Sequence, residues 1–133
     1  MVSVSDTLDS FLARVADRGG YGCAQQTARA VQHVLEVLGA HLVGDDRTDL
    51  ARLLPHHCGP LLSATEPASE PLTPDGFVRA VAERADDDAS EARRAVTAVL
   101  PTLAESVDDA LLRRVLTQLP PGHAGLFGRT DPV

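Results

Sequence analysis

The chain carries one pattern of residues twice, at positions about 65 residues apart. The run from Ala30 to Leu38 (AVQHVLEVL) returns from Ala95 to Leu103 (AVTAVLPTL), and Leu54-Pro55 returns as Leu119-Pro120. Four earlier residues match with one more residue of offset, since Phe11, Val15, Ala16 and Arg18 return as Phe77, Val81, Ala82 and Arg84. Most shared positions are apolar and lie at helical spacing, which indicates a tandem duplication that records packing rather than chemistry.

The first repeat, about residues 5–62, predicts three helices and a closing turn. Ser5 or Asp6 is expected to cap the first helix, whose buried stripe is Leu8, Phe11, Leu12 and Val15, and Gly19-Gly20 is expected to end it. A longer apolar stripe from Ala24 to Leu42 predicts the central helix, with its end at Gly44. Asp45 or Asp46 then begins a third helix that Pro55 terminates, and a turn through Leu61-Leu62 closes the unit.

The second repeat, about residues 74–127, begins after a linker at 63–73 that is rich in Pro and small residues. Thr73 followed by Pro74 is a helix start, and Asp88 with Glu91 is a capping-box-like start of the next helix. Pro101 stands where the first repeat has Glu36, deep in that helix, so we expect a kink there. The last helix is expected from Asp109 to Gln118.

These elements predict an all-α fold of two tandem three- to four-helix repeats. Each repeat has only a narrow stripe to bury, so we expect both to pack as one pseudo-two-fold helical bundle, a single domain over residues 1–133. The expected shared core is Val31, Leu35, Leu38, Val96, Leu100 and Leu103.

Composition supports helices and excludes several partners. The chain has no Ile, Lys or Asn, and Leu, Val and Ala supply most of its core, a balance typical of helices encoded by a GC-rich genome. A net charge of −7 argues against nucleic acid as a partner. The basic pairs Arg93-Arg94 and Arg113-Arg114 are expected to form intrahelical ion pairs on a solvated face. No apolar run is long enough for a membrane span, so we expect a soluble cytoplasmic protein with Cys23 and Cys58 as free buried thiols.

The paired units also carry a family signature. Each unit has Phe-x-x-x-Val-Ala in its first helix, Ala-Val-x-x-Val-Leu-x-x-Leu in its second, and Leu-Pro followed by Leu-Leu or Leu-Phe at its end. From about Leu8 to Phe127 this pattern resembles bacterial domain-of-unknown-function family 2267, most specifically at Thr117-Gln118-Leu119-Pro120 and Leu126-Phe127. The resemblance implies an all-helical prokaryotic protein, often actinobacterial, and provides no catalytic residues to carry over. Pro101 and the Gly-rich first loop depart from the pattern.

Three places where the repeats differ could hold local chemistry. His56-His57-Cys58, with Cys23, could offer zinc ligands, but its spacing favours a helix-terminal turn. Gly19-Gly20-Tyr21-Gly22 could expose backbone N–H groups to an anion, but no strand precedes it and no Lys follows, which favours a helix stop. Asp86-Asp87-Asp88 lacks the spacing of a calcium loop and is expected to cap helices and complement their dipoles.

No catalytic constellation is visible. His33 and His41 lie about two turns apart, so both are expected to point the same way from a half-exposed flank of the central helix. No serine has the context of a nucleophile elbow. We therefore assign no catalytic, cofactor-binding or metal-binding residue and no cofactor.

Two functional hypotheses follow. The first is a non-enzymatic protein-interaction module that binds an unknown protein partner or itself through apolar surface left by the duplication. The second is a small-molecule-binding protein or enzyme with a polar pocket between the repeats. A cavity lined by several polar groups would favour the second, and a broad apolar patch would favour the first.

Overall fold

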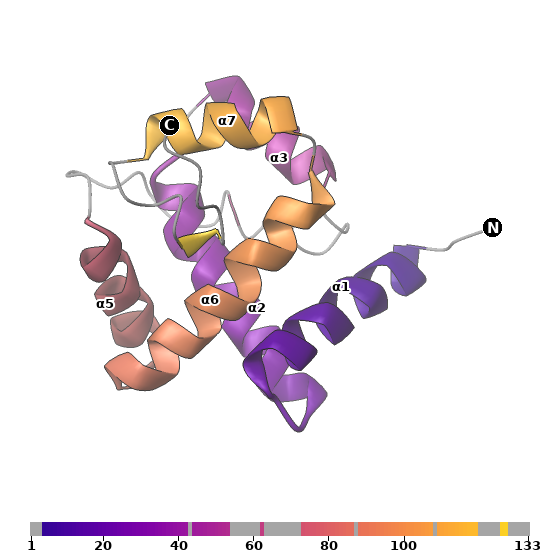
Figure 1. The fold of residues 1–133 in the computed structure, drawn as a ribbon, viewed down its shortest axis with the longest axis vertical. Helices are drawn as coiled ribbons and strands as arrows, with labels where there is room; N and C mark the ends of the chain where they lie inside the picture. The colour runs from indigo at the N-terminus through magenta and orange to yellow at the C-terminus, as the bar shows by residue number, and fades with distance from the viewer. Residues whose placement is uncertain are drawn as a thin grey trace.

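Helices make up nearly all of the part of the chain that the structure describes. The computed structural model describes residues 4–42, 44–53, 62, 73–86, 88–107, 109–119 and 126–127, and these contain no strand. The helices are α1 (Val4–Gly19), α2 (Ala24–Ala40), α3 (Gly44–Leu53), α5 (Pro74–Ala85), α6 (Ala89–Ser106) and α7 (Asp109–Gln118) (Figure 1). The all-α class expected from the sequence is confirmed.

Two helix starts in the second half follow the local capping rules. The Thr73 hydroxyl accepts a hydrogen bond from the Gly76 amide at 3.0 Å, and Pro74 occupies the first turn of α5. The Asp88 carboxylate accepts from the Glu91 amide at 2.8 Å and caps α6. Both predicted caps are confirmed. The bounds expected for α7 agree with those of the structure.

Helices α1 and α5 end in the same left-handed backbone conformation. Gly20 follows α1 with φ of 68°, and the Tyr21 amide donates to the Ala16 carbonyl at 3.0 Å, which closes the last turn. Asp86 follows α5 with φ of 55° and ψ of 41°. Asp86 is therefore the C-cap of α5 and Asp88 is the N-cap of α6, so both cap helices as expected. Asp87 lies outside the described residues.

The end of α2 falls earlier than the apolar stripe indicated. The helix stops at Ala40, and the His41 amide donates to the Leu38 and Gly39 carbonyls, which tightens the final turn. Leu42 is fully buried but lies beyond the helix, and α3 already begins at Gly44. The expectation that α2 would run to Gly44 is therefore wrong. Leu42 continues the apolar pattern because it is buried in the core, but it is not part of the helix.

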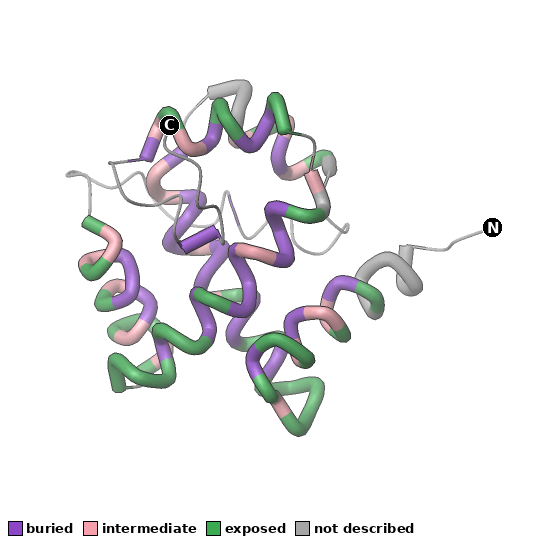
Figure 2. The backbone as a smooth tube through the Cα atoms, in the orientation of Figure 1, coloured by how far each residue is buried: buried purple, intermediate pink, exposed green. Residues whose placement is uncertain are grey.

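The core forms where α2 and α6 pack against each other at the centre of the molecule (Figures 1 and 2). Helix α1 packs on both α6 and α2, helix α5 packs on both α2 and α6, and α3 packs on α7. All six residues expected in the shared core are buried: Val31, Leu35, Leu38, Val96, Leu100 and Leu103. Phe11 of α1 and Phe77 of α5 are also buried, at matching positions in the two halves.

Ion pairs join the first helix of each half to the central helix of the other half. Arg18 of α1 pairs with Glu105 of α6, and its Nη1 donates to the buried Thr102 hydroxyl at 2.8 Å. Arg84 of α5 pairs with Glu36 of α2 at 3.6 Å. Because Pro101 occupies the position that corresponds to Glu36, the carboxylate of α6 comes instead from Glu105, one turn further along.

The arginine pairs reach mainly to neighbouring helices, which corrects the expectation of intrahelical pairs. Arg93 pairs with Asp75 of α5 at 3.3 Å, and Arg114 pairs with Asp49 of α3 at 3.2 Å. The Arg94–Glu91 pair, at 3.4 Å, lies within one helix, as expected. The carboxylates of the packed neighbours compete with those on the same helix, and sequence spacing does not reveal them.

Gly39 allows the backbone at Leu62 to approach α2 closely. A Cβ atom at position 39 would overlap the Leu62 carbonyl and its Cα, which are backbone atoms that cannot rotate away. The buried Leu62 side chain is thereby held against the core. Glycine at this position is required by packing, because its own φ lies outside the left-handed region.

We expect Gly39→Ala to lower the free energy of unfolding by about 1–3 kcal/mol, because overlap with backbone outweighs the helix propensity of alanine. Chemical denaturation of both proteins measures the difference. Gly22→Ala is the matched control, since a Cβ there meets nothing within 4 Å. An equal effect of both substitutions would contradict the packing argument.

Helix α6 runs through Pro101 as one continuous helix. Proline removes the hydrogen bond to the Thr97 carbonyl, so we expect Pro101→Glu to restore it and to raise stability by about 1 kcal/mol or more. Thermal and urea unfolding of the variant test this. A loss of stability would mean that the proline improves packing through a bend, and that bend stays a prediction.

Candidate functional site

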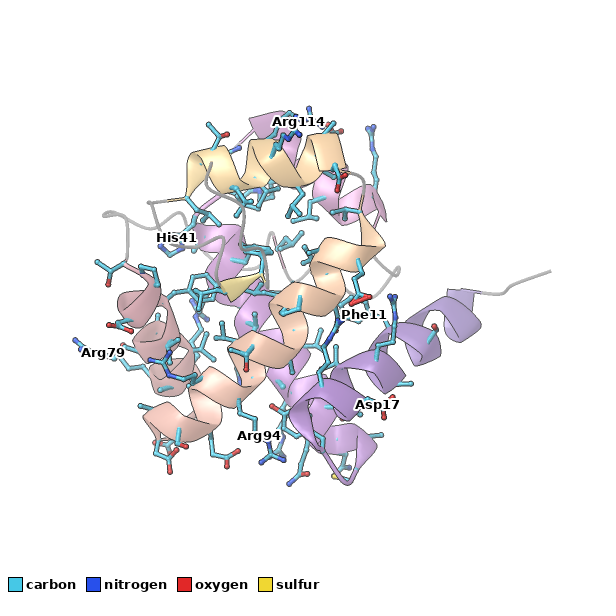
Figure 3. All side chains as sticks on the ribbon, viewed as in Figure 1. Phe11, Asp17, His41, Arg79, Arg94 and Arg114 are labelled. Carbon is cyan, nitrogen blue, oxygen red and sulfur yellow. The ribbon has the colours of Figure 1, made fainter. Side chains whose placement is uncertain are left out.

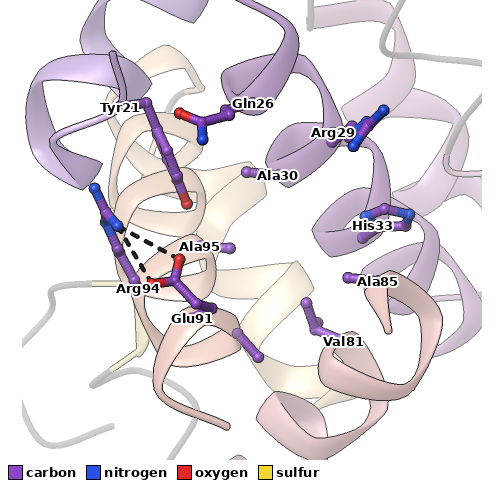
Figure 4. A pocket seen from close by; sticks show the side chains of 11 residues that line it. Tyr21, Gln26, Arg29, Ala30, His33, Val81, Ala85, Glu91, Arg94 and Ala95 are labelled. Atoms are coloured by element: carbon purple, nitrogen blue, oxygen red, sulfur yellow. Dashed lines mark hydrogen bonds and ion pairs between the residues drawn. The ribbon is translucent and has the colours of Figure 1, made fainter. Parts of the chain in front are cut away.

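A pocket of about 210 Å³ lies between α2, α5 and α6, and the Tyr21 side chain forms one wall of it (Figure 4). Each half of the chain contributes about half of the lining. Three lining residues of α2 have counterparts 65 positions later on α6, so Gln26, Arg29 and Ala30 correspond to Glu91, Arg94 and Ala95. The site therefore lies between matching faces of the two central helices.

The floor of the pocket is apolar and made of small side chains. Ala30 and Ala95 are each 7% exposed, and Ala92 and Val81 are each 1% exposed. Methyl groups fill little space above the helix backbones, so a depression remains where larger side chains would close the surface. The rim is polar and exposed, with Gln26 and Arg29 on one side and Glu91 and Arg94 on the other.

Arg94 is fully engaged by its surroundings. Its Nε donates to the Gly19 carbonyl and its Nη2 to the Gly20 carbonyl, the latter at 2.8 Å. Its Nη1 lies 3.4 Å from Glu91, and its guanidinium carbon lies 4.8 Å from the centre of the Tyr21 ring. Arg94 thus satisfies carbonyls at the end of α1 and holds Tyr21 over the pocket, at the junction of α1 and α6 in Figure 3.

Arg29 and His33 form the opposite, α2 side of the pocket. They lie one turn apart along α2, and His33 is next to Ala85 of α5 (Figure 4). Neither side chain makes a hydrogen bond or an ion pair within the described ranges. This wall therefore carries polar groups whose hydrogen-bonding capacity is not used by the described residues.

His33 and His41 both face α5, as their spacing predicted. His33 shares the pocket with Val81, and the His41 ring lies 6.0 Å from the Phe77 ring. The His41 Nδ1 is 2.8 Å from the Val37 carbonyl, one turn earlier on the same helix. His41 thus packs at the end of α2, and only His33 takes part in the pocket.

The other sequence candidates do not form a ligand site in the described residues. The glycine loop turns its Gly19 and Gly20 carbonyls toward Arg94, which makes it a helix stop that accepts hydrogen bonds rather than an anion site. Cys23 is exposed at the start of α2, which corrects the expectation of a buried thiol, because the turn before α2 lies at the surface. His56, His57 and Cys58 lie outside the described residues. Within the described ranges, no three His, Cys, Asp or Glu side chains gather closely enough to hold a metal ion.

A second hollow of about 330 Å³ lies between α1 and the start of α2. Its lining is mainly apolar and includes Leu12, Ala16, Ala24 and Tyr21, which lines the first pocket as well. Tyr21 therefore separates the two hollows.

Arg29 and the pocket were not predicted from the sequence. Candidate sites were sought where the repeats differ, whereas Arg29 and Ala30 have identical counterparts in Arg94 and Ala95. The sequence signal that could have revealed them is three pairs of residues, each 65 positions apart: Gln26 and Glu91, Arg29 and Arg94, and Ala30 and Ala95. Only the first pair differs in residue type.

None of the helices in the described ranges is both long and apolar enough to cross a membrane. No curated protein matches the chain at a significant level. A family model matches residues 8–126, nearly the whole span over which the resemblance was expected. The chain therefore belongs to the family described as uncharacterized conserved protein (DUF2267).

Proposed function

We propose that this chain is a non-enzymatic protein-interaction module of a bacterial, actinobacterial type, and that it binds its partner at the pocket between the two halves. The proposal includes a cytoplasmic location, and the net charge of −7 argues against nucleic acid. Self-association through the same pocket is a form of the same proposal.

The size and openness of the pocket carry this proposal. At about 210 Å³ it is smaller than the roughly 300–1,000 Å³ typical of sites that enclose drug-sized ligands. Four polar rim residues are exposed, so an occupant would remain in contact with solvent. A single side chain inserted from a partner surface suits such a site, because the rest of the partner would cover the rim.

A second candidate is small-molecule binding, or catalysis, in the same pocket. The polar side chains around the pocket favour it, because convergent polar groups above an apolar floor are typical of ligand sites. The Glu91 carboxylate is the one carboxylate among the described lining residues, and it is paired with Arg94. This pairing favours binding over general-base chemistry.

We also propose that the halves are tandem repeats related by a pseudo-two-fold axis and form one domain. The helix contacts support this proposal because α1 and α5, the first helices of the two halves, each pack on both central helices, and the central helices pack on each other. The Arg18–Glu105 and Arg84–Glu36 ion pairs each join a first helix to the central helix of the other half.

Separate halves, residues 1–66 and 67–133, should be largely unstructured by circular dichroism. Each half alone would expose the apolar face that it buries against the other, and a short helix is marginal without tertiary packing. Mixing the halves should restore part of the helical signal. Two halves that are well folded and melt independently would contradict the single-domain proposal.

Blocking the pocket should abolish partner capture. We expect a tagged Gln26→Trp protein to retain its partner at least tenfold less than the wild type from a lysate of the encoding bacterium, because the indole covers the rim. Gln25→Trp is the matched control, since residue 25 is also exposed on α2 but is not among the described lining residues.

The measurement is quantitative mass spectrometry of proteins retained by the three baits. A protein retained by the wild type and by Gln25→Trp but lost from Gln26→Trp supports the proposal. Identical retention by all three baits would overturn it.

A further inference from the structure

The two sides of the pocket carry the same pair of helix positions with different charge. On α6, Glu91 and Arg94 lie three residues apart and form an ion pair at 3.4 Å. On α2, the corresponding residues are Gln26 and Arg29, so a neutral amide stands where the second half has a carboxylate. One side of the pocket therefore contains an ion pair, and the other carries a guanidinium that pairs with no carboxylate of the described residues.

Arg29 also lacks the second set of contacts that Arg94 makes, which are hydrogen bonds to backbone carbonyls at the end of a neighbouring helix. Arg94 donates to the Gly19 and Gly20 carbonyls at the end of α1. The end of α5 at Ala85 also lines the pocket, yet Arg29 makes no such bond to the described residues. Its guanidinium donors remain available to a ligand.

The surroundings of Arg29 suit a small anion. His33 lies one turn along α2 and offers a second nitrogen, whereas the Gln26 amide points toward Tyr21 and away from Arg29 (Figure 4). The buried alanine floor lowers the local dielectric, which strengthens a charge-assisted hydrogen bond above it. A planar carboxylate matches the two-donor fork of a guanidinium, and a short alkyl group attached to it would fit over Ala30 and Ala95.

We infer that the pocket binds a carboxylate group, which Arg29 holds by its guanidinium with His33 one turn further along α2, over the alanine floor. The inference rests on the proposed function, because it identifies the chemistry of the group that enters the same pocket. The carboxylate belongs either to an acidic side chain of the partner or to a free short-chain acid, and the chemistry of recognition is the same.

The test is an NMR titration of the isotope-labelled full chain with sodium acetate, with sodium chloride at equal ionic strength as reference. We expect saturable shifts at the backbone amides of Arg29, Ala30 and His33 with acetate only. Gln26→Glu should weaken acetate binding at least tenfold. The new carboxylate stands three residues before Arg29, as Glu91 stands before Arg94, and should form the same kind of ion pair with Arg29. Arg29→Gln should weaken it to the same extent.

Ala110→Glu is the matched control for net charge. It adds the same charge on α7, which contributes no residue to the described lining, so acetate affinity should change less than twofold. Thermal unfolding of each variant verifies that the fold is kept. Absence of saturable shifts in the wild type, or equal weakening by Gln26→Glu and Ala110→Glu, would overturn the inference.

Two further ligands distinguish the sources of the carboxylate. Binding of N-acetyl-glutamate methylamide at least as tight as that of propionate identifies a partner side chain as the source, whereas binding of propionate alone identifies a free acid. In the experiment with Gln26→Trp, the indole blocks entry to the pocket sterically, whatever the chemistry of the group that enters. Loss of capture without acetate binding would therefore reject the carboxylate and keep the pocket as the partner site.

Discussion

Helices α2 and α6 pack against each other through stripes of fully buried residues, and α1 and α5 each pack on both of them. A single stripe of this kind exposes apolar surface unless another element covers it. The contact between the central helices covers both stripes at once. Phe11 of α1 and Phe77 of α5 are buried where these helices pack on the two central helices.

Two ion pairs between the halves, Arg18–Glu105 and Arg84–Glu36, help to orient the helices that the apolar contact brings together. Arg18 and Arg84 keep part of their surface exposed, so each pair contributes only a small stabilisation, of the order of 1 kcal/mol or less. Their value lies in orientation, because each fixes a first helix against the central helix of the other half. Pro101 removed the carboxylate position that Glu36 keeps, and Glu105 supplies that charge one turn later. Glu105 thereby joins α1 to α6 although Pro101 stands at the position that corresponds to Glu36.

The pocket is a consequence of the same arrangement. Alanine at positions 30, 92 and 95 leaves a shallow depression between the central helices, and α5 and Tyr21 form its sides. Arg94 donates its hydrogen bonds to carbonyls at the end of α1 and so holds that end in place. On the α6 side of the pocket, the arginine therefore has a structural role. Arg29, at the matching position, is left without that task. Divergence between matching positions thus separates a residue that holds the fold from one that is available to a ligand.

Local features of this protein were determined by the sequence alone. The caps at Thr73 and Asp88, the bounds of α7 and the stop at Gly19-Gly20 follow from hydrogen bonds within a few residues, so local rules predicted them. Spacing also identified the six buried residues of the central contact, because helical periodicity places them on one face. The early end of α2, the exposure of Cys23 and the partners of Arg93 and Arg114 depended on which elements lie alongside. The pocket depended on it as well. Its lining comes from residues far apart in the chain, and only the packing of α2, α5 and α6 brings Arg29 beside a floor of alanines from both halves.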